Sequence, residues 1–136
     1  MVTFTITYDG SLRCSAVHDP SATRLVTDAP KDNHGRGESF SPTDLAATSL
    51  ATCMITTMAI QTRADGLALE GIRAQVEKHM TTTPPRRIAR IVVRLHMPKG
   101  IPAAARERLQ KIAHACPVAL SLHPDVVQDV SFVYPD

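Results

Sequence analysis

The segment from Leu45 to Thr62 constrains this chain most, because it contains no charged residue. A helix start precedes it at residues 41–44, Ser-Pro-Thr-Asp. Serine can cap a helix, proline suits the first helical position, and an aspartate three residues after the cap complements the helix dipole. The pattern therefore predicts a helix that runs to about Ala64 and stops at Asp65-Gly66.

A charge-free helix of this length is long enough to cross a membrane. Its six serine and threonine residues and its small alanines lower its hydrophobicity, and strands with polar turns make up the rest of the chain. These features favour a helix that is buried on nearly every side and no membrane partner. One small sheet covers only one face of such a helix. We therefore expect the same helix of a second copy to cover the other face, which makes the protein a homodimer.

Alternation of apolar and polar positions marks the strands of this sequence. The predicted strands are 2–8, 11–18, 23–27, 67–80, 86–97 and 126–134. The first three suggest an antiparallel meander, and the turn at 81–85 makes the next two a hairpin.

Two further helices are predicted at 102–115, with Leu109, Ile112 and Ala113 facing inward, and at 117–122. Strands followed by a helix, a hairpin, helices and a strand define an α+β class, which we expect to form one domain, residues 1–136. Residues 29–40 contain proline and glycine without periodicity, and we predict a functional loop there.

Composition and charge exclude several classes of protein. Fifteen basic and 13 acidic residues leave a net charge of +2, and aromatic residues make up only 4% with no tryptophan. No nucleic-acid partner is expected from such a chain. The N-terminus begins directly with a strand pattern instead of a signal peptide, which favours a reducing, cytoplasmic compartment. His114, Cys116 and His123 lack the paired spacing of zinc sites, and no phosphate-binding glycine loop is present, so we expect no metal and no cofactor.

Three cysteines in a chain of 136 residues do not make a disulfide scaffold. Cys116 immediately precedes Pro117, which places its sulfur at a helix cap, where backbone amides favour the thiolate. A purely structural cap is the alternative. Cys53 lies in the middle of the charge-free helix, where a core thiol is the alternative to a reactive one. Cys14 lies in an N-terminal strand, and we assign it no role.

Two motifs in this order are specific when taken together. Ser41-Pro42-Thr43-Asp44-Leu45-Ala46-Ala47 leads to Leu50-Ala51 and Cys53, and Cys116-Pro117-Val118 follows later. This arrangement resembles the OsmC/Ohr family of thiol-dependent peroxidases and stress proteins, over most of the chain. The resemblance implies a domain-swapped homodimer with two central buried helices wrapped by antiparallel sheets, and active sites at the subunit interface.

The resemblance also implies roles for particular residues. Cys53 would be the peroxidatic cysteine and Cys116 the resolving one. An arginine from an N-terminal strand usually supports the thiolate in this family; Arg13 matches that position best, and Arg36 in the loop is a competitor. Hydroperoxide-resistance members commonly carry glutamate directly after the proline of the helix start, whereas this chain has Thr43 there. Glu38 is a candidate substitute, with a solvated loop carboxylate as the alternative.

The chemistry explains why such residues are needed. Cys53 lies several turns from the helix start and gains little from the dipole, while apolar neighbours such as Leu50 and Met54 disfavour its charged form. An arginine within reach would offset that cost and hold the peroxide oxygens. Attack gives a sulfenic acid, Cys116 condenses with it to a disulfide, and an external dithiol or thiol restores both cysteines.

Two functions stay open from the sequence. The first is a cofactor-free antioxidant peroxidase for organic hydroperoxides, whose aliphatic pocket would include Leu50 and Met54, with Arg36 and Glu38 nearby. The alternative is an OsmC-like small-molecule binding protein or thiol redox sensor with little turnover. Thr43 favours the alternative, whereas the presence of both Cys53 and Cys116 favours the peroxidase.

Overall fold

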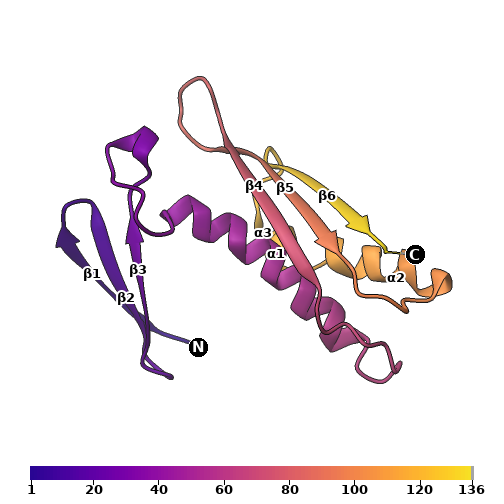
Figure 1. Cartoon of the computed structure of the whole chain (residues 1–136). Coiled ribbons are helices and arrows are strands. Elements are labelled where there is room, and N and C mark those ends of the chain that lie inside the picture. Colours follow the sequence, from indigo (N-terminus) through magenta and orange to yellow (C-terminus); the bar gives the residue numbers. More distant parts are fainter. Residues whose placement is uncertain (136) are drawn as a thin grey trace. The chain divides into compact units, whose positions relative to one another are not determined.

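A computed structural model describes residues 1–135 of the chain. Asp136, the last residue of the expected single domain 1–136, lies outside the described residues. The chain divides into two compact units, Met1–Ala46 and Ala47–Asp136. Figure 1 labels their helices and strands, and each unit is described by itself below.

The first unit is built on the predicted antiparallel meander. Its sheet has the order β1-β2-β3, formed by β1 (Phe4–Gly10), β2 (Arg13–His18) and β3 (Thr23–Asp28). Ser11 and Leu12 connect β1 to β2 with φ angles of 53° and 62°. Two positive φ angles in a two-residue connection match the right-handed twist of a hairpin. This tight turn fixes the register that pairs Gly10 with Arg13, and the pairing of β2 with β3 places Asp28 opposite Arg13.

A loop and a helix start complete the first unit. The loop contains a single 3₁₀ turn, η1 (Lys31–Asn33), and leads to α1 (Pro42–Gln61). Ser41 and Asp44 cap α1 reciprocally: the Asp44 amide donates to Ser41 Oγ at 3.1 Å, and the Ser41 amide donates to Asp44 Oδ2 at 2.9 Å. The predicted helix start is confirmed, with aspartate in the role that glutamate takes in most capping boxes.

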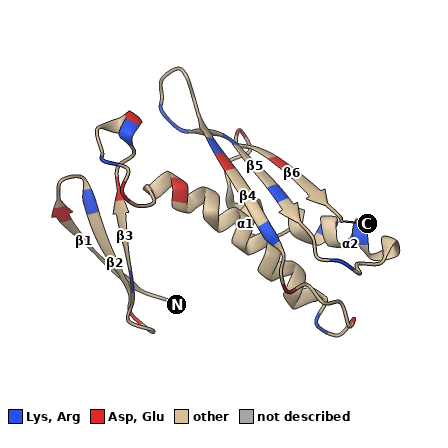
Figure 2. Ribbon diagram, viewed as in Figure 1, with Lys and Arg blue, Asp and Glu red and all other residues tan. Residues whose placement is uncertain are grey.

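In the second unit, α1 buries one face and leaves the other open. Its buried residues follow helical spacing and are Ala47, Leu50, Ala51, Met54 and Met58. The opposite face carries exposed residues such as Thr52, Thr56 and Ile60. Burial on nearly every side is therefore not reached within one chain. By length and composition alone α1 could cross a bilayer, with a mean hydropathy of 1.2, although core helices of water-soluble proteins pass the same test. In Figure 2, α1 carries a charge only near its start.

The sheet of the second unit has the order β4-β5-β6, formed by β4 (Arg73–Met80), β5 (Ile88–His96) and β6 (Val127–Val133). The predicted hairpin of β4 and β5 is confirmed, but residues 67–72 precede the strand. The expectation of purely antiparallel sheets is wrong, because β6 pairs with β5 in parallel. Its connection passes through two helices, and such a crossover returns the chain in the same direction, unlike a hairpin.

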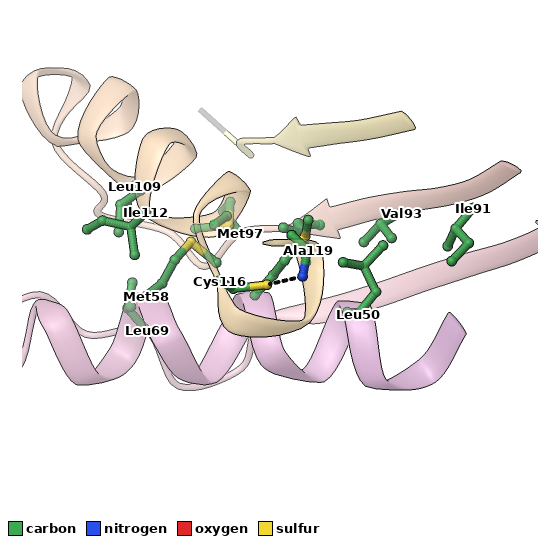
Figure 3. Close-up of a cluster of buried hydrophobic side chains, with 14 of the residues drawn as sticks. Leu50, Met58, Leu69, Ile91, Val93, Met97, Leu109, Ile112, Cys116 and Ala119 are labelled. Atoms are coloured by element: carbon green, nitrogen blue, oxygen red, sulfur yellow. Dashed lines mark hydrogen bonds between the residues drawn. The ribbon is translucent and has the colours of Figure 1, made fainter. Parts of the chain in front are cut away.

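These two helices are α2 (Ala103–His114) and α3 (Pro117–Ser121). Leu109, Ile112 and Ala113 are buried on α2, as predicted. They pack with the buried face of α1 and with the inner row of β5, Ile91, Val93 and Leu95, in one core that Figure 3 shows in close-up. The observed class is therefore α+β, with helices and two sheets.

Candidate thiol site

The two cysteines of the family-like motifs lie side by side in the second unit. Cys53 is half-buried in the middle of α1, and Cys116 has no accessible surface at the start of α3. Their side chains are within hydrogen-bonding distance of each other. The fold thus brings together two thiols that are far apart in the sequence.

Local sequence explains the position of Cys116. Pro117 occupies the first turn of α3, and a residue before proline favours extended backbone, which Cys116 adopts with φ −67° and ψ 151°. Its sulfur accepts a hydrogen bond from the Ala119 amide at 3.4 Å (Figure 3). Cysteine therefore takes the capping place that serine or threonine usually fills. The prediction that Cys116 caps this helix is confirmed.

The surroundings of Cys116 keep its thiol protonated. Burial raises the pKa of Cys116, and the hydrogen bond and charge of Cys53 raise it further, while the backbone amides of Ala119 and Val118 lower it. Burial is the largest of these effects. A protonated Cys116 beside Cys53 acts as a hydrogen-bond donor. Cys53 is half-buried and is the more exposed of the two cysteines.

A hydroxyl group also contacts Cys53. Thr57, one turn further along α1, places its Oγ1 3.9 Å from Cys53 Sγ. Sequence reasoning gave Thr57 no role, although its separation of four residues from Cys53 puts both side chains on one helix face.

A second cluster lies in the first unit around Arg13. Its guanidinium Nη2 donates to Glu38 Oε2 at 2.6 Å and to Asp28 Oδ2 at 3.4 Å. The pKa of Arg13 is raised, first by the hydrogen bond with Glu38 and by its charge, and also by Asp28. Glu38 is therefore the ion-pair partner of Arg13 and not merely a solvated loop carboxylate.

Asp28 anchors this cluster, and sequence reasoning missed its role. The side chain is only 1% exposed, and its Oδ2 also accepts the Glu38 backbone amide at 2.9 Å. Within residues 1–135, Asp28 Oδ1 and Arg13 Nε are buried without a hydrogen-bond partner. The register of β2 with β3 is the signal for Asp28, because it places this residue opposite Arg13.

The loop of residues 29–40 is held tightly against the end of β3. The Gly37 amide donates to Ala29 O, and the Gly35 amide donates to Pro30 O. A Cβ atom at Gly35 would lie 1.7 Å from Ala29 O, so only glycine fits this close approach. These contacts fold the loop so that Glu38 lies beside Arg13.

The other candidate residues differ in how far they are buried. Leu50 and Met54 have no accessible surface and belong to the core, whereas Arg36 is exposed on the loop. Their assignment to a substrate pocket stays a prediction.

Cys14 is half-buried and lines an apolar hollow of about 510 Å³ on the first sheet. Thr43 lies 3.2 Å from Ser41 through their hydroxyl oxygens. Within residues 1–135, no three histidine, cysteine or acidic side chains gather in a group that could hold a metal ion.

The chain is thus a small α+β protein with a pair of interacting thiols, Cys53 on the long helix α1 and Cys116 at the start of the short helix α3. Comparison with known proteins identifies the family: the sequence model described as OsmC-like protein matches residues 35–131. The chain therefore belongs to the OsmC-like protein family. No curated protein sequence matches it.

Solved structures agree with this assignment. A protein of Psychrobacter arcticus 273-4, described as a proposed osmotic stress induced and detoxification response protein, is 41% identical with a TM-score of 0.92, covering 98% of this chain and 96% of the other. An organic hydroperoxide resistance protein OsmC of Legionella pneumophila is 18% identical with a TM-score of 0.76, covering 97% and 96%. A protein of Vibrio cholerae, described as a proposed organic hydroperoxide resistance protein with captopril bound in one of the active sites, is 17% identical with a TM-score of 0.75. The match covers 97% of this chain and 90% of the other. The last two similarities concern the fold.

Proposed function

We propose that this protein is a cofactor-free, cysteine-based peroxidase that reduces organic hydroperoxides. The observation that carries the proposal is the contact between the half-buried Cys53 and the buried, protonated Cys116. A thiol pair of this kind supplies both halves of a two-step reduction, one sulfur to attack and one to resolve. The names of the Legionella and Vibrio proteins, which share the fold, suggest the substrate class.

The reaction balances with the two thiols and an external reductant. The Cys53 thiolate attacks one peroxide oxygen, so that a sulfur–oxygen bond forms, the oxygen–oxygen bond breaks, and the alkoxide leaves as an alcohol after taking a proton. Cys53 is then a sulfenic acid. The Cys116 thiol displaces its hydroxyl as water and forms the Cys53–Cys116 disulfide. An external dithiol or thiol returns both cysteines to the thiol state by exchange.

In this proposal Arg13 supports the Cys53 thiolate and the departing alkoxide. Its Nη2 is held by Glu38 and Asp28, whereas its buried Nε has no partner within residues 1–135. A guanidinium that is oriented by two carboxylates, on a side chain that stays 31% exposed, suits the binding of an anionic sulfur or oxygen. Glu38 thereby supplies the carboxylate that the family pattern places at the position of Thr43.

We further propose that the active protein is the swapped homodimer of the family, in a reducing cytoplasm. Two uncovered surfaces support the dimer, an uncharged face of α1 and an apolar face of the first sheet. One face of α1 is open, and the first sheet exposes apolar side chains around its hollow, including Phe4 at 59% and Ile6 at 61%. Soluble monomers rarely leave such patches uncovered. Light scattering at micromolar concentration should show two copies, and a stable monomer would contradict the dimer.

The peroxidase proposal is tested by titrating the reduced protein with cumene hydroperoxide. We expect the loss of two free thiols per hydroperoxide, a Cys53–Cys116 link by mass spectrometry, and turnover when a dithiol is added. A Cys14→Ser variant is the matched control, because this cysteine has no part in the reaction and its replacement should change none of these results.

The same titration separates the alternatives. Loss of two thiols without turnover would favour a redox sensor, and no loss at all would leave a small-molecule binding protein. Thr43 at the position of the usual glutamate is the feature that favours these alternatives.

A further inference from the structure

The threonines of α1 do not all use their hydroxyl groups in the same way. Thr52 and Thr56 donate to the backbone carbonyls of Thr48 and Thr52, four residues earlier, at 3.0 and 2.9 Å. Such bonding within the helix is the usual arrangement for a helical threonine. In contrast, the partner of the Thr57 hydroxyl within residues 1–135 is the sulfur of Cys53.

The direction of this hydrogen bond depends on the state of the sulfur. A hydroxyl both donates and accepts, whereas a thiolate only accepts. Once Cys53 is ionised, Thr57 must therefore be the donor. The buried Cys116 thiol donates to the same sulfur from α3. The Cys53 anion then has two donors from the second unit, and hydrogen bonds to a charged group are the stronger kind.

We propose that Thr57 is a further catalytic residue, whose hydroxyl donates to the Cys53 thiolate and holds that sulfur in position for attack. The inference rests on the proposed function, since it concerns the same sulfur. A helical threonine divides between two rotamers, one of which bonds to the backbone, and in Thr57 the hydroxyl is directed at Cys53 instead. Thr57 thereby fixes the sulfur along the helix.

Thr57→Val tests the proposal, because valine keeps the shape and branching and removes only the hydroxyl. Thr56→Val is a matched control one residue earlier, where the hydroxyl bonds to the backbone and is exposed. Thr57→Ser retains a donor. The measurement is the alkylation rate of the Cys53 peptide against pH, quantified by mass spectrometry in the otherwise native protein.

We expect Thr57→Val to move the midpoint of the Cys53 alkylation profile upward by about 0.5 to 1 pH unit, which slows alkylation below the midpoint roughly three- to tenfold. Thr56→Val and Thr57→Ser should leave the midpoint within about 0.2 unit. Cys116 of α3 is the ionisable group that contacts Cys53, and all variants retain it.

Equal profiles for Thr57→Val and Thr56→Val would overturn the proposal. Should Thr57→Val not fold, judged by far-ultraviolet circular dichroism, Thr57→Ala takes its place with the same expected direction. Alkylation needs no peroxide, so this test is independent of turnover. A shifted midpoint in a protein without peroxidase turnover would uphold Thr57 as the donor to Cys53 and reject the proposed reaction, whereas turnover with an unshifted midpoint would do the reverse.

Discussion

Replacing Asp28 tests how the Arg13 cluster is held. The carboxylate is 1% exposed and accepts from two donors, the Glu38 amide at 2.9 Å and Arg13 Nη2 at 3.4 Å. Removing one partner of a fully buried ion pair costs about 3–5 kcal/mol. Here the Arg13 side chain is 31% exposed and keeps Glu38, so most of the loss comes from the hydrogen bonds to a charged acceptor. We therefore expect Asp28→Ala to lower the free energy of unfolding by about 2–3 kcal/mol.

Two further variants separate charge from hydrogen bonding. Asp28→Asn keeps an oxygen for the Glu38 amide and loses the charge, which should cost about 1–2 kcal/mol. Glu38→Gln acts on the more exposed pair and should cost less than about 1 kcal/mol. The order of the three losses follows from the burial of each carboxylate.

Urea unfolding followed by far-ultraviolet circular dichroism measures these differences, at one fixed protein concentration and with all thiols reduced, because dimerisation would otherwise change the apparent stability. In a thermal melt, Asp28→Ala should lower the midpoint by roughly 6–12 °C for a chain of this size. A loss for Asp28→Ala no larger than that for Glu38→Gln would refute the reasoning, because Asp28 would then not anchor the cluster.

Other expectations follow from the thiol site and the core. Cys116→Ser keeps an oxygen for the cap but stops the proposed reaction at the Cys53 sulfenic acid, which a dimedone-type reagent should trap; recovery of unmodified thiol after peroxide treatment would contradict this. Burial raises the pKa of both Cys116 and Tyr134, so the unfolded chain ionises first, and the free energy of unfolding should fall as pH rises past the ordinary thiol value of 9.0. Urea melts at about pH 8 and about pH 10 measure this change. A free energy of unfolding that is larger at about pH 10 than at about pH 8 would contradict the prediction. Leu50→Ala should cost about 2–5 kcal/mol, because this fully buried side chain fills the core between α1 and the second sheet; a loss below about 1 kcal/mol in a urea melt would show that the site collapses freely.

Local signals made much of the fold predictable. The helix start at residues 41–44 is set by side chains that bond to neighbouring amides, so the sequence alone identifies it. The Cys116-Pro117 cap is local for the same reason. The sequence predicts the end of α1 at about Ala64, whereas the helix ends at Gln61, since helix ends fray and glycine marks them only approximately.

Long-range pairing was not predictable in the same way. The parallel pairing of β6 with β5 depends on the route of the chain through α2 and α3, and the residues of β6 themselves do not indicate its direction. Asp28 and Thr57 were missed because each looks ordinary in sequence, one as a strand end and the other as one of several helix threonines. Their importance arises from what lies opposite: Arg13 across a strand pair and Cys53 across a helix turn.

The division of the chain into two units assigns different steps of the proposed reaction to different parts of the molecule. The two thiols and Thr57 all belong to the second unit, so disulfide formation needs only contacts that this unit contains by itself. Arg13, Asp28 and Glu38 all belong to the first unit. The proposed role of Arg13 in the attack on the peroxide therefore draws on a residue outside the unit that holds the two thiols. In these terms Arg13→Ala should slow the oxidation of Cys53 while leaving the subsequent condensation with Cys116 unchanged, because no group of the first unit takes part in that second step.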